Sequence, residues 1–351
     1  MSALSVASSP HFREDLNIKS VMYAVVVALA PAAVGAFYFF GPRALFIIAI
    51  GAAAAVTAEA LCGIAGGRKI TVADGSALVT GILLAFNLPP GVPYWLPIVG
   101  SVFAIAVAKV PFGGLGYNLL NPALAARAFL VISWPIYMTS GWTAPARGTL
   151  SGTSGIDAVT GATPLGVFRL ARGILGDPSS SAQDLAAAQE NLAYLYSKGS
   201  LVNHLFGNVG GCIGETSVLL LAIGAAYLFA RRIISWRIPT AYLATVALFT
   251  WIAGGEEWFQ GNPLFHLMSG GLMLGAFFMA TDIVTSPVTP AGRLIFGIGC
   301  GAITSVIRLK GAYPEGVSYS ILLMNLTVPL IDRLTRPRIL GERRRLTWPR
   351  I

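Results

Sequence analysis

Long apolar segments alternate with short polar stretches along most of the 351-residue chain. A helix needs about 20 consecutive apolar residues to cross a bilayer, and fewer when it is broken. By this measure the sequence predicts about ten transmembrane helices, five on each side of a long polar stretch. The predicted fold class is therefore an all-α integral membrane protein. The predicted spans cover residues 20–40, 43–63, 75–89, 92–109 and 120–140, then 214–230, 238–254, 264–281, 291–308 and 316–332.

Two of these spans carry helix-breaking residues. The third ends at Asn87-Leu-Pro-Pro90. The eighth runs through Gly270-Gly271 towards a proline-rich turn, Ser286-Pro-Val-Thr-Pro290. Broken helices at membrane depth are tolerated only where they are buried in protein or line a cavity. We therefore expect discontinuous helices at both places.

The two five-helix groups resemble each other near the end of the fourth span. The segments 109–121 and 308–325 both start with a basic residue and continue through glycine, tyrosine and paired leucines to an asparagine. An odd number of spans per repeat puts the two repeats in opposite orientations, and such transporters bind their ligands where the repeats meet. The sequence thus predicts two inverted five-helix repeats.

Charge is scarce and unevenly placed. Only 11% of residues are charged, against about 25% in soluble domains. The net charge of +9 comes from basic residues between and beyond the apolar segments, which is typical of anchoring to membrane lipid and not of nucleic-acid binding. The asymmetry predicts a cytoplasmic N-terminus, a periplasmic loop and a basic cytoplasmic tail. The predicted division is 1–19 (N-terminus), 20–140 (first repeat), 141–213 (loop), 214–332 (second repeat) and 333–351 (tail).

The metal-binding residue types are dispersed. Cys62, Cys212 and Cys300 form no CxxC pair, which argues against an iron–sulfur cluster or zinc site held by this chain alone. The histidines are equally scattered, and we expect the membrane-embedded His266 to be a packing or interfacial residue. No metal site is predicted.

Several polar residues lie within or beside the spans. Arg127 lies inside the fifth span, so we expect it to pair with a carboxylate or with another protein of a complex. Lys109 and Arg308 end their helices and are expected to extend towards the lipid headgroups. Asp74 and Asp282 lie at ends of the broken helices, where they act either as local caps or as part of a cation site.

The long loop has two parts. Residues 181–198 predict an amphipathic surface helix with Ser181 and Asp184 as caps. Before it stands a short polar motif, Asp157-Ala-Val-Thr-Gly-Ala-Thr163, followed by Pro164. Taken alone, this motif is typical of an ordinary turn in an exposed loop.

Five blocks together carry a family resemblance. The whole chain resembles the RnfD component of the Rnf ion-translocating oxidoreductase complex and, more distantly, the NqrB component of the sodium-pumping NADH:quinone reductase. The blocks reach nearly every part of the chain. They are Asp74-Gly-Ser-Ala-Leu-Val-Thr-Gly81, Asn118-Leu-Leu-Asn-Pro-Ala-Leu-Ala-Ala-Arg127, Asp157 to Leu165, Met279-Ala-Thr-Asp-Ile-Val-Thr-Ser-Pro287, and Tyr313-Pro-Glu-Gly316 through Asn325.

The resemblance implies a covalent cofactor. In this family the last threonine of Asp-x-x-Ser/Thr-Gly-Ala-Thr carries FMN through a phosphoester, and here that residue is Thr163. A flavin transferase would attach the FMN and read Asp157. Thr160, Gly161 and Ala162 complete the motif.

The resemblance also implies a second, non-covalent flavin, riboflavin or another, in the membrane region. Asn118, Asn121 and Asn325 are candidates to bond its polar edge. The competing interpretation is that these amides bond exposed backbone near the helix breaks.

The function implied is that of a membrane component in an electron-transport complex of the ferredoxin:NAD oxidoreductase type. Such a complex translocates Na⁺ or H⁺ across the bacterial inner membrane. The partners would be the A, B, C, E and G subunits of the Rnf complex, and this chain would not act on NAD or ferredoxin alone. The alternative is a ten-helix channel or transporter, similar to urea and ammonium channels, without a redox role, because a fold does not fix a function.

Overall fold

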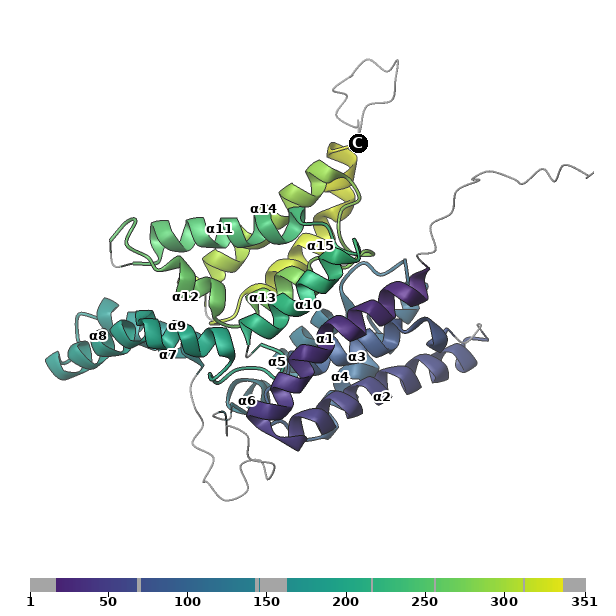
Figure 1. Cartoon of the computed structure of the whole chain (residues 1–351), viewed down its shortest axis with the longest axis horizontal. Helices are drawn as coiled ribbons and strands as arrows, with labels where there is room; N and C mark the ends of the chain where they lie inside the picture. Colours follow the sequence, from purple (N-terminus) through teal and green to yellow (C-terminus); the bar gives the residue numbers. More distant parts are fainter. Residues whose placement is uncertain are drawn as a thin grey trace, which may run out of the picture.

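The computed structural model describes residues 17–67, 71–142, 145, 163–215, 217–255, 257–311 and 313–336. Within these ranges every regular element is a helix. Two groups of helices lie side by side, and a smaller group projects from one end (Figure 1). The all-α prediction is therefore confirmed for this part of the chain.

The first group holds the helices that precede the long loop. A capping box formed by Asn17 and Ser20 begins α1. The predicted span 120–140 is divided at Trp134-Pro135, because a proline supplies no N–H to continue a helix. The elements are α1 (Ile18–Phe40), α2 (Pro42–Ala65), η1 (Val72–Asp74), α3 (Ser76–Phe86), α4 (Trp95–Ala106), η2 (Val110–Phe112), α5 (Pro122–Ser133) and α6 (Pro135–Thr139).

The second group follows the loop and contains the more fragmented span. Residues 263–279 form α12, α13 and a π-helical segment, η3, with a break at Gly270. Gly270 has φ +66°, a conformation that favours a residue without a Cβ. Since α3 also stops early, before Asn87, both predicted helix breaks are confirmed. The elements are α10 (Val218–Ala230), α11 (Arg237–Ala253), α12 (Pro263–Met268), α13 (Leu272–Leu274), η3 (Gly275–Met279), α14 (Pro290–Lys310) and α15 (Val317–Leu334).

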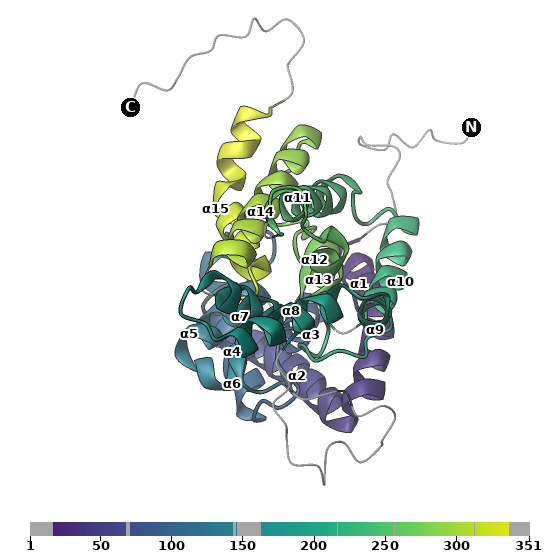
Figure 2. The same ribbon diagram turned by 90° about the vertical axis from the view of Figure 1, so that its left-hand side faces the viewer.

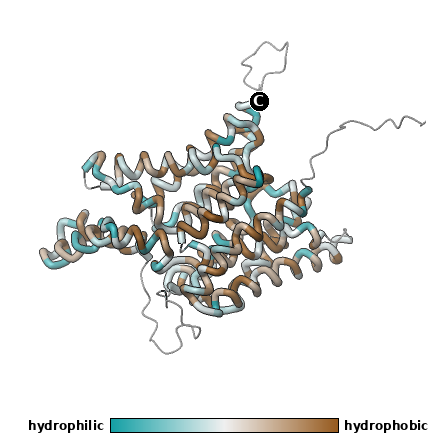
Figure 3. Tube along the Cα trace, viewed as in Figure 1, coloured by the Kyte–Doolittle hydropathy of each residue, from teal (hydrophilic) through white to brown (hydrophobic). Residues whose placement is uncertain are grey.

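Many of these helices have the length and composition of membrane spans. Apolar residues run along both groups (Figure 3), and large apolar side chains such as Val34, Leu61 and Ile132 are more than 60% exposed. Such surfaces belong in hydrocarbon and not in water. The chain is a multi-pass membrane protein. Five segments of the described chain are long and apolar enough to cross a membrane: Ile18–Phe40, Pro42–Ala65, Trp95–Phe112, Pro290–Lys310 and Val317–Leu334. Shorter apolar helices are α3, α5, α10 and α11.

The smaller group comprises α7 (Pro164–Gly176), α8 (Ala182–Tyr196) and α9 (Lys198–Phe206). It lies across the end of the two larger groups (Figure 2). The predicted amphipathic helix is confirmed as α8, and its cap is Ser181, whose Oγ accepts the Asp184 N–H. An apolar cluster joins this small group to α12; its buried members are Leu165, Phe168, Leu195 and Phe265.

The two large groups meet along two helix pairs. In these pairs α1 packs against α10, and α5 packs against α15. Within the groups, α2 packs against both α3 and α4, and α11 packs against α14. One apolar core runs through both groups and includes Leu29, Phe86 and Phe296.

Candidate functional site

Thr163 begins α7 at the junction of the three helix groups. It has extended backbone, its side-chain Oγ1 accepts the Gly166 N–H at 3.2 Å, and Pro164 follows as the first helical residue. Only 7% of Thr163 is exposed. The predicted motif residues Asp157, Thr160, Gly161 and Ala162 lie outside the described residues, so their roles stay predictions.

A cavity of about 210 Å³ lies beside Thr163. Its walls come from α5, α6, α7 and the turn that precedes α15, so both large helix groups contribute to it. Aromatic rings and two charged groups share the lining, which suits a flat ring system with polar edges. The lining residues are Arg127, Ala128, Val131, Met138, Thr139, Trp142, Thr163, Gly166, Tyr313, Pro314, Glu315, Ser318 and Tyr319.

Arg127 lines this cavity and contacts several polar side chains. Its Nη2 pairs with Glu315 Oε2, and its Nη1 lies 3.5 Å from Glu215 Oε1. Nη1 also donates to Asn87 Oδ1 and Ser318 Oγ, both at 2.8 Å. The prediction that Arg127 pairs with a carboxylate is confirmed. Both carboxylates come from the second half of the chain, so the contact ties the two helix groups together.

The cluster holds two carboxylates for one cation. Burial raises the pKa of Glu215 to about 8; the neighbouring Glu315 carboxylate raises it further, while Arg127 opposes the shift. Burial also raises the pKa of the Cys212 thiol, whose Sγ lies 3.7 Å from Arg127 Nη2. Cys212, Glu215 and Glu315 offer ligand atoms within 4.8 Å of one another, yet Arg127 contacts all three, which makes this an ion-pair cluster and not a metal site.

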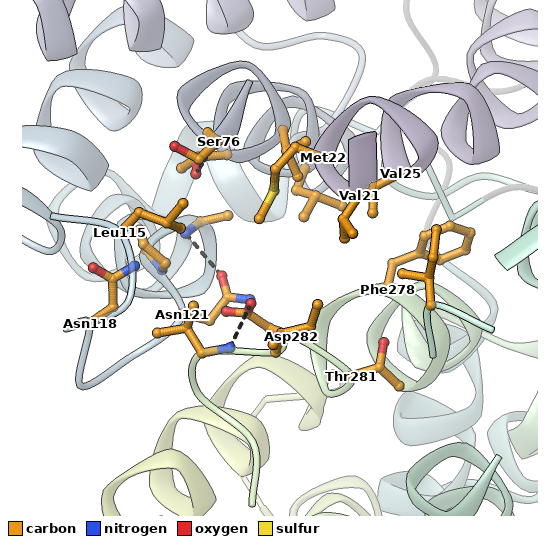
Figure 4. A pocket seen from close by; sticks show the side chains of 18 of the residues that line it. Val21, Met22, Val25, Ser76, Leu115, Asn118, Asn121, Phe278, Thr281 and Asp282 are labelled. Carbon is orange, nitrogen blue, oxygen red and sulfur yellow. Dashed lines mark hydrogen bonds between the residues drawn. The ribbon is translucent and has the colours of Figure 1, made fainter. Parts of the chain in front are cut away.

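A second cavity lies between the helix groups, away from Thr163 (Figure 4). Its volume is about 80 Å³, and Asn118, Asn121 and Asp282 supply polar wall groups opposite the apolar side chains of α1. Asn121 caps α5 by accepting the Ala123 N–H and also donates to the Met279 carbonyl. Asn325, with its amide oriented to satisfy its neighbours, accepts the Asn121 N–H and donates to the carbonyls of Ile321 and Thr285. Asn121 and Asn325 therefore bond backbone groups, as the competing interpretation predicted.

Asp74 and Asp282 are local caps. Asp74 accepts from the Ser76 N–H and hydroxyl at the start of α3. Asp282 accepts from the Val284 N–H and the Thr285 hydroxyl in the turn after η3. The capping interpretation is confirmed for both.

The expectation that Lys109 and Arg308 extend to the lipid headgroups is wrong. Both are buried, at 1% and 4% exposure. Lys109 Nζ lies 2.5 Å from Glu59 Oε1 and 2.6 Å from Ser76 Oγ. Arg308 donates to the carbonyls of His266 and Ser269 at the helix break. Partners inside the protein outcompete the headgroups because a carboxylate on α2 meets Lys109, and because the helix break leaves backbone carbonyls free for Arg308.

Sequence reasoning missed three acidic residues. Glu59 lies inside the predicted span 43–63, and an ionisable group at membrane depth is by itself a signal of a buried partner. Glu215 stands in the loop that precedes α10, and Glu315 stands in the Tyr313–Gly316 block. His266 is a packing residue, as predicted: its ring lies edge-on to Phe168 and Phe265.

Comparison with known proteins gives a consistent answer along the whole chain. Residues 5–341 match the NQR2, RnfD, RnfE family. The D subunit of a Na⁺-translocating ferredoxin:NAD⁺ oxidoreductase complex from Acetobacterium woodii is 49% identical over 96% of this chain and 95% of its own. The D subunit of a proton-translocating ferredoxin:NAD⁺ oxidoreductase complex from Clostridium ljungdahlii is 46% identical over 97% of both chains. The D subunit of an ion-translocating oxidoreductase complex from Stutzerimonas stutzeri is 40% identical over 94% of both. The chain therefore belongs to the NQR2, RnfD, RnfE family.

Proposed function

We propose that this chain is the membrane-embedded D subunit of an ion-translocating ferredoxin:NAD oxidoreductase complex and carries FMN esterified to Thr163. The names of its relatives support the role in a complex. The chain would act as an enzyme only within that complex, with the A, B, C, E and G subunits as partners. The relatives from A. woodii and C. ljungdahlii are named for different ions, so likeness to them does not choose between Na⁺ and H⁺.

The position of Thr163 is the observation that carries the cofactor proposal. As the N-cap of α7, its oxygen lies at the positive end of a helix of 13 residues, where an attached phosphate would be favoured. The cavity beside it offers Tyr313, Tyr319 and Trp142 for a ring system. FMN has both parts, a flat ring system and a phosphate. When bound, it would supply the electron transfer, and the protein would supply its position and electrostatics.

A covalent attachment can be tested by mass spectrometry of the intact chain. The wild-type chain should be heavier than its sequence by one FMN less one water, and the extra mass should map to the peptide that contains Thr163. Thr163→Val should remove the extra mass, because no hydroxyl remains to form the ester. Thr139→Val, which changes another threonine of the same cavity, should keep it. Extra mass retained on Thr163→Val would sink the assignment.

The inverted-repeat architecture is part of the proposal and rests on matching contacts. The pairs α2 with α4 and α11 with α14 would be equivalent, while α1 with α10 and α5 with α15 would cross the twofold interface. Lys109 and Arg308, near the ends of equivalent helices, each bond a broken helix: Lys109 bonds Ser76 at the start of α3, and Arg308 bonds the Ser269 carbonyl at the end of α12. These relations favour ten spans in two repeats.

The start of α1 and the end of α15 lie away from α7–α9 (Figure 1), which supports termini and Thr163 on opposite sides of the membrane. In a bacterial inner membrane the termini would be cytoplasmic and Thr163 periplasmic.

The second, non-covalent flavin remains a separate proposal. The cavity of Figure 4 is its candidate place, because Asn118 Oδ1 is buried without a hydrogen-bond partner there. This cavity, at about 80 Å³, and the one beside Thr163, at about 210 Å³, are both smaller than the roughly 300–1,000 Å³ of typical ligand pockets, so a flavin ring in either place would require the surrounding groups to move apart. The alternative function, a channel without redox chemistry, predicts a chain that carries no flavin in either place.

A further inference from the structure

Several buried polar atoms near Thr163 have no hydrogen-bond partner. In the described part of the chain, eight buried side-chain nitrogen or oxygen atoms have no hydrogen-bond partner, and six belong to His204, Glu215, His266, Ser269 and Arg308. Buried polar groups normally find partners, protein or water, because leaving them unpaired costs free energy. Their concentration beside one site points to something that they bind.

A small cavity joins part of this set to the candidate cofactor site. Its volume is about 10 Å³, enough for about one water molecule. Thr163, His204, Glu215 and Glu315 all line it. His204 Nδ1 is bonded to the Ser200 carbonyl, whereas its Nε2 is unpartnered. The water would therefore have a histidine nitrogen and carboxylate oxygens as neighbours.

The two carboxylate oxygens of Glu215 have different surroundings. Its Oε1 faces Arg127 at 3.5 Å, and its Oε2 has no partner. The carboxylate lies against the backbone of Gly271, where an added Cβ would stand 2.3 Å from Oε1. The other charged or titratable groups that face it are Glu315 from the turn before α15, Arg308 from α14, Cys212 from its own loop and His204 from α9.

The buried charges around Glu215 balance as long as no further charge arrives. When both carboxylates are ionised, the two anions Glu215 and Glu315 are matched by two cations, Arg127 and Arg308. Arg127 and Glu315 also line the cavity beside Thr163, so negative charge arriving there is felt directly by this cluster. A proton on one carboxylate restores neutrality. Burial raises the pKa of Glu215 to about 8, and nearby negative charge would raise it further, so we expect Glu215 to take up the proton at and above about pH 8.

We propose that Glu215 is a redox-linked proton acceptor, which takes up one proton when a cofactor attached at Thr163 gains negative charge. This inference rests on the proposed function above. Glu215 is favoured over Glu315 because its Oε2 is buried without a partner and because its contact with Arg127, at 3.5 Å, is longer than that of Glu315. A proton is favoured over a metal cation because the guanidinium of Arg127 would repel the cation at this distance.

If a cofactor attached at Thr163 took two electrons from a carrier of another protein in the complex and one proton, its charge would become more negative by one unit. Glu215 would then balance that charge by forming an O–H bond at Oε2 with a second proton from the aqueous phase. His204 lines the same water-sized cavity as Glu215, and its Nε2 would hold a water there. Loss of the two electrons would break the O–H bond and return the proton to the aqueous phase.

The test is the pH dependence of the flavin midpoint potential, measured on the full chain with its cofactor attached. For a two-electron couple, each proton taken up on reduction shifts the potential by about 30 mV per pH unit. Wild-type chain should therefore show a slope steeper by about 30 mV per pH unit than Glu215→Gln, over the interval between the two pKa values of Glu215. Glu190→Gln, an exposed change on α8, should match wild type.

Three outcomes decide the proposal. The proposal is supported if the steeper slope appears in wild type and in Glu190→Gln but not in Glu215→Gln. Equal slopes in chains shown by mass to carry FMN would overturn it and leave the proposed function intact, as would a potential that follows Na⁺ concentration instead of pH. Absence of the FMN mass would overturn both. If Glu215→Gln does not fold, Glu215→Asp should keep the steep slope. In flavin-free Thr163→Val an infrared carboxylic-acid band should titrate near pH 8, and this band should shift in frequency when Glu215 is also changed to Asp; a band that stays unchanged would overturn the proposal.

Discussion

Lys109 and Arg127 are both buried cations of the first helix group, but they are neutralised in different ways. Lys109 has one carboxylate partner, Glu59, on a neighbouring helix of the same group. Arg127 has two, Glu215 and Glu315, and both come from the other half of the chain. Lys109 and Glu59 form one pair of opposite charges within a rigid unit. Arg127 is shared by two anions at the junction of two units, beside Thr163, and the second cation that faces Glu215, Arg308, is bonded to backbone carbonyls.

The difference is that between a structural ion pair and a responsive one. A closed buried pair can often be exchanged for apolar residues of similar volume without loss of stability. A cluster of several charges beside a cavity instead responds to charge that arrives in that cavity, because the low dielectric of the interior screens the charge poorly. The three predictions below separate these two behaviours.

The largest effect is expected from Arg127→Met. The change leaves Glu215 and Glu315 buried without their cation, and breaking a buried pair in this way costs about 3–5 kcal/mol. The thermal unfolding midpoint in detergent should fall by many degrees. Arg333→Met, at the exposed end of α15, is the matched control and should unfold like wild type. Equal midpoints for the two variants would show that the cluster does not hold the halves together.

A smaller and reversible effect is expected at the Lys109 pair. Lys109→Met alone should lower the unfolding midpoint, because Glu59 is left buried and unpaired. The double change Lys109→Met with Glu59→Leu should recover most of that loss, to within about 1 kcal/mol of wild type, since both charges are removed together. A double variant as unstable as the single one would mean that apolar residues cannot replace this ion pair.

The smallest effect is a dependence of stability on pH. The pKa of Glu215 is raised in the folded chain from 4.5 to about 8. Between these values the folded state keeps a proton that the unfolded state has lost, so stability should fall as pH rises through this window, by at most about 1.4 kcal/mol per pH unit. Unfolding midpoints at pH 6 and pH 9, measured on wild type and Glu215→Gln, check the sign. A midpoint of Glu215→Gln that falls as steeply as that of wild type would assign the effect to another group.

Local features of the fold were accessible from the sequence. Apolar segment length predicted where helix lies, prolines and glycines predicted the breaks near Asn87 and Gly270, and Ser181 predicted the start of α8. Each of these depends on residues close together in the chain. Boundaries were less accurate: the span predicted at 120–140 stops at Ser133, because Pro135 interrupts it.

The partners of buried charges were harder to predict. That Arg127 must find a carboxylate followed from the cost of an unpaired charge in a membrane. Lys109 and Arg308 were wrongly assigned to the headgroups, because their position at helix ends gives no sign that acceptors from another helix lie within reach.

The sequence by itself determined that this chain is a helical membrane protein with broken spans, a basic tail and the motif that ends at Thr163. Apolar length, helix breakers and scarce charge act over a few turns of chain, so no knowledge of packing was needed. Only the tertiary structure decided that Thr163, Arg127, Glu215 and Glu315 share one site. Their separation along the chain, from residue 127 to residue 315, is bridged by helix packing, and the electrostatics of the site arise from that contact alone.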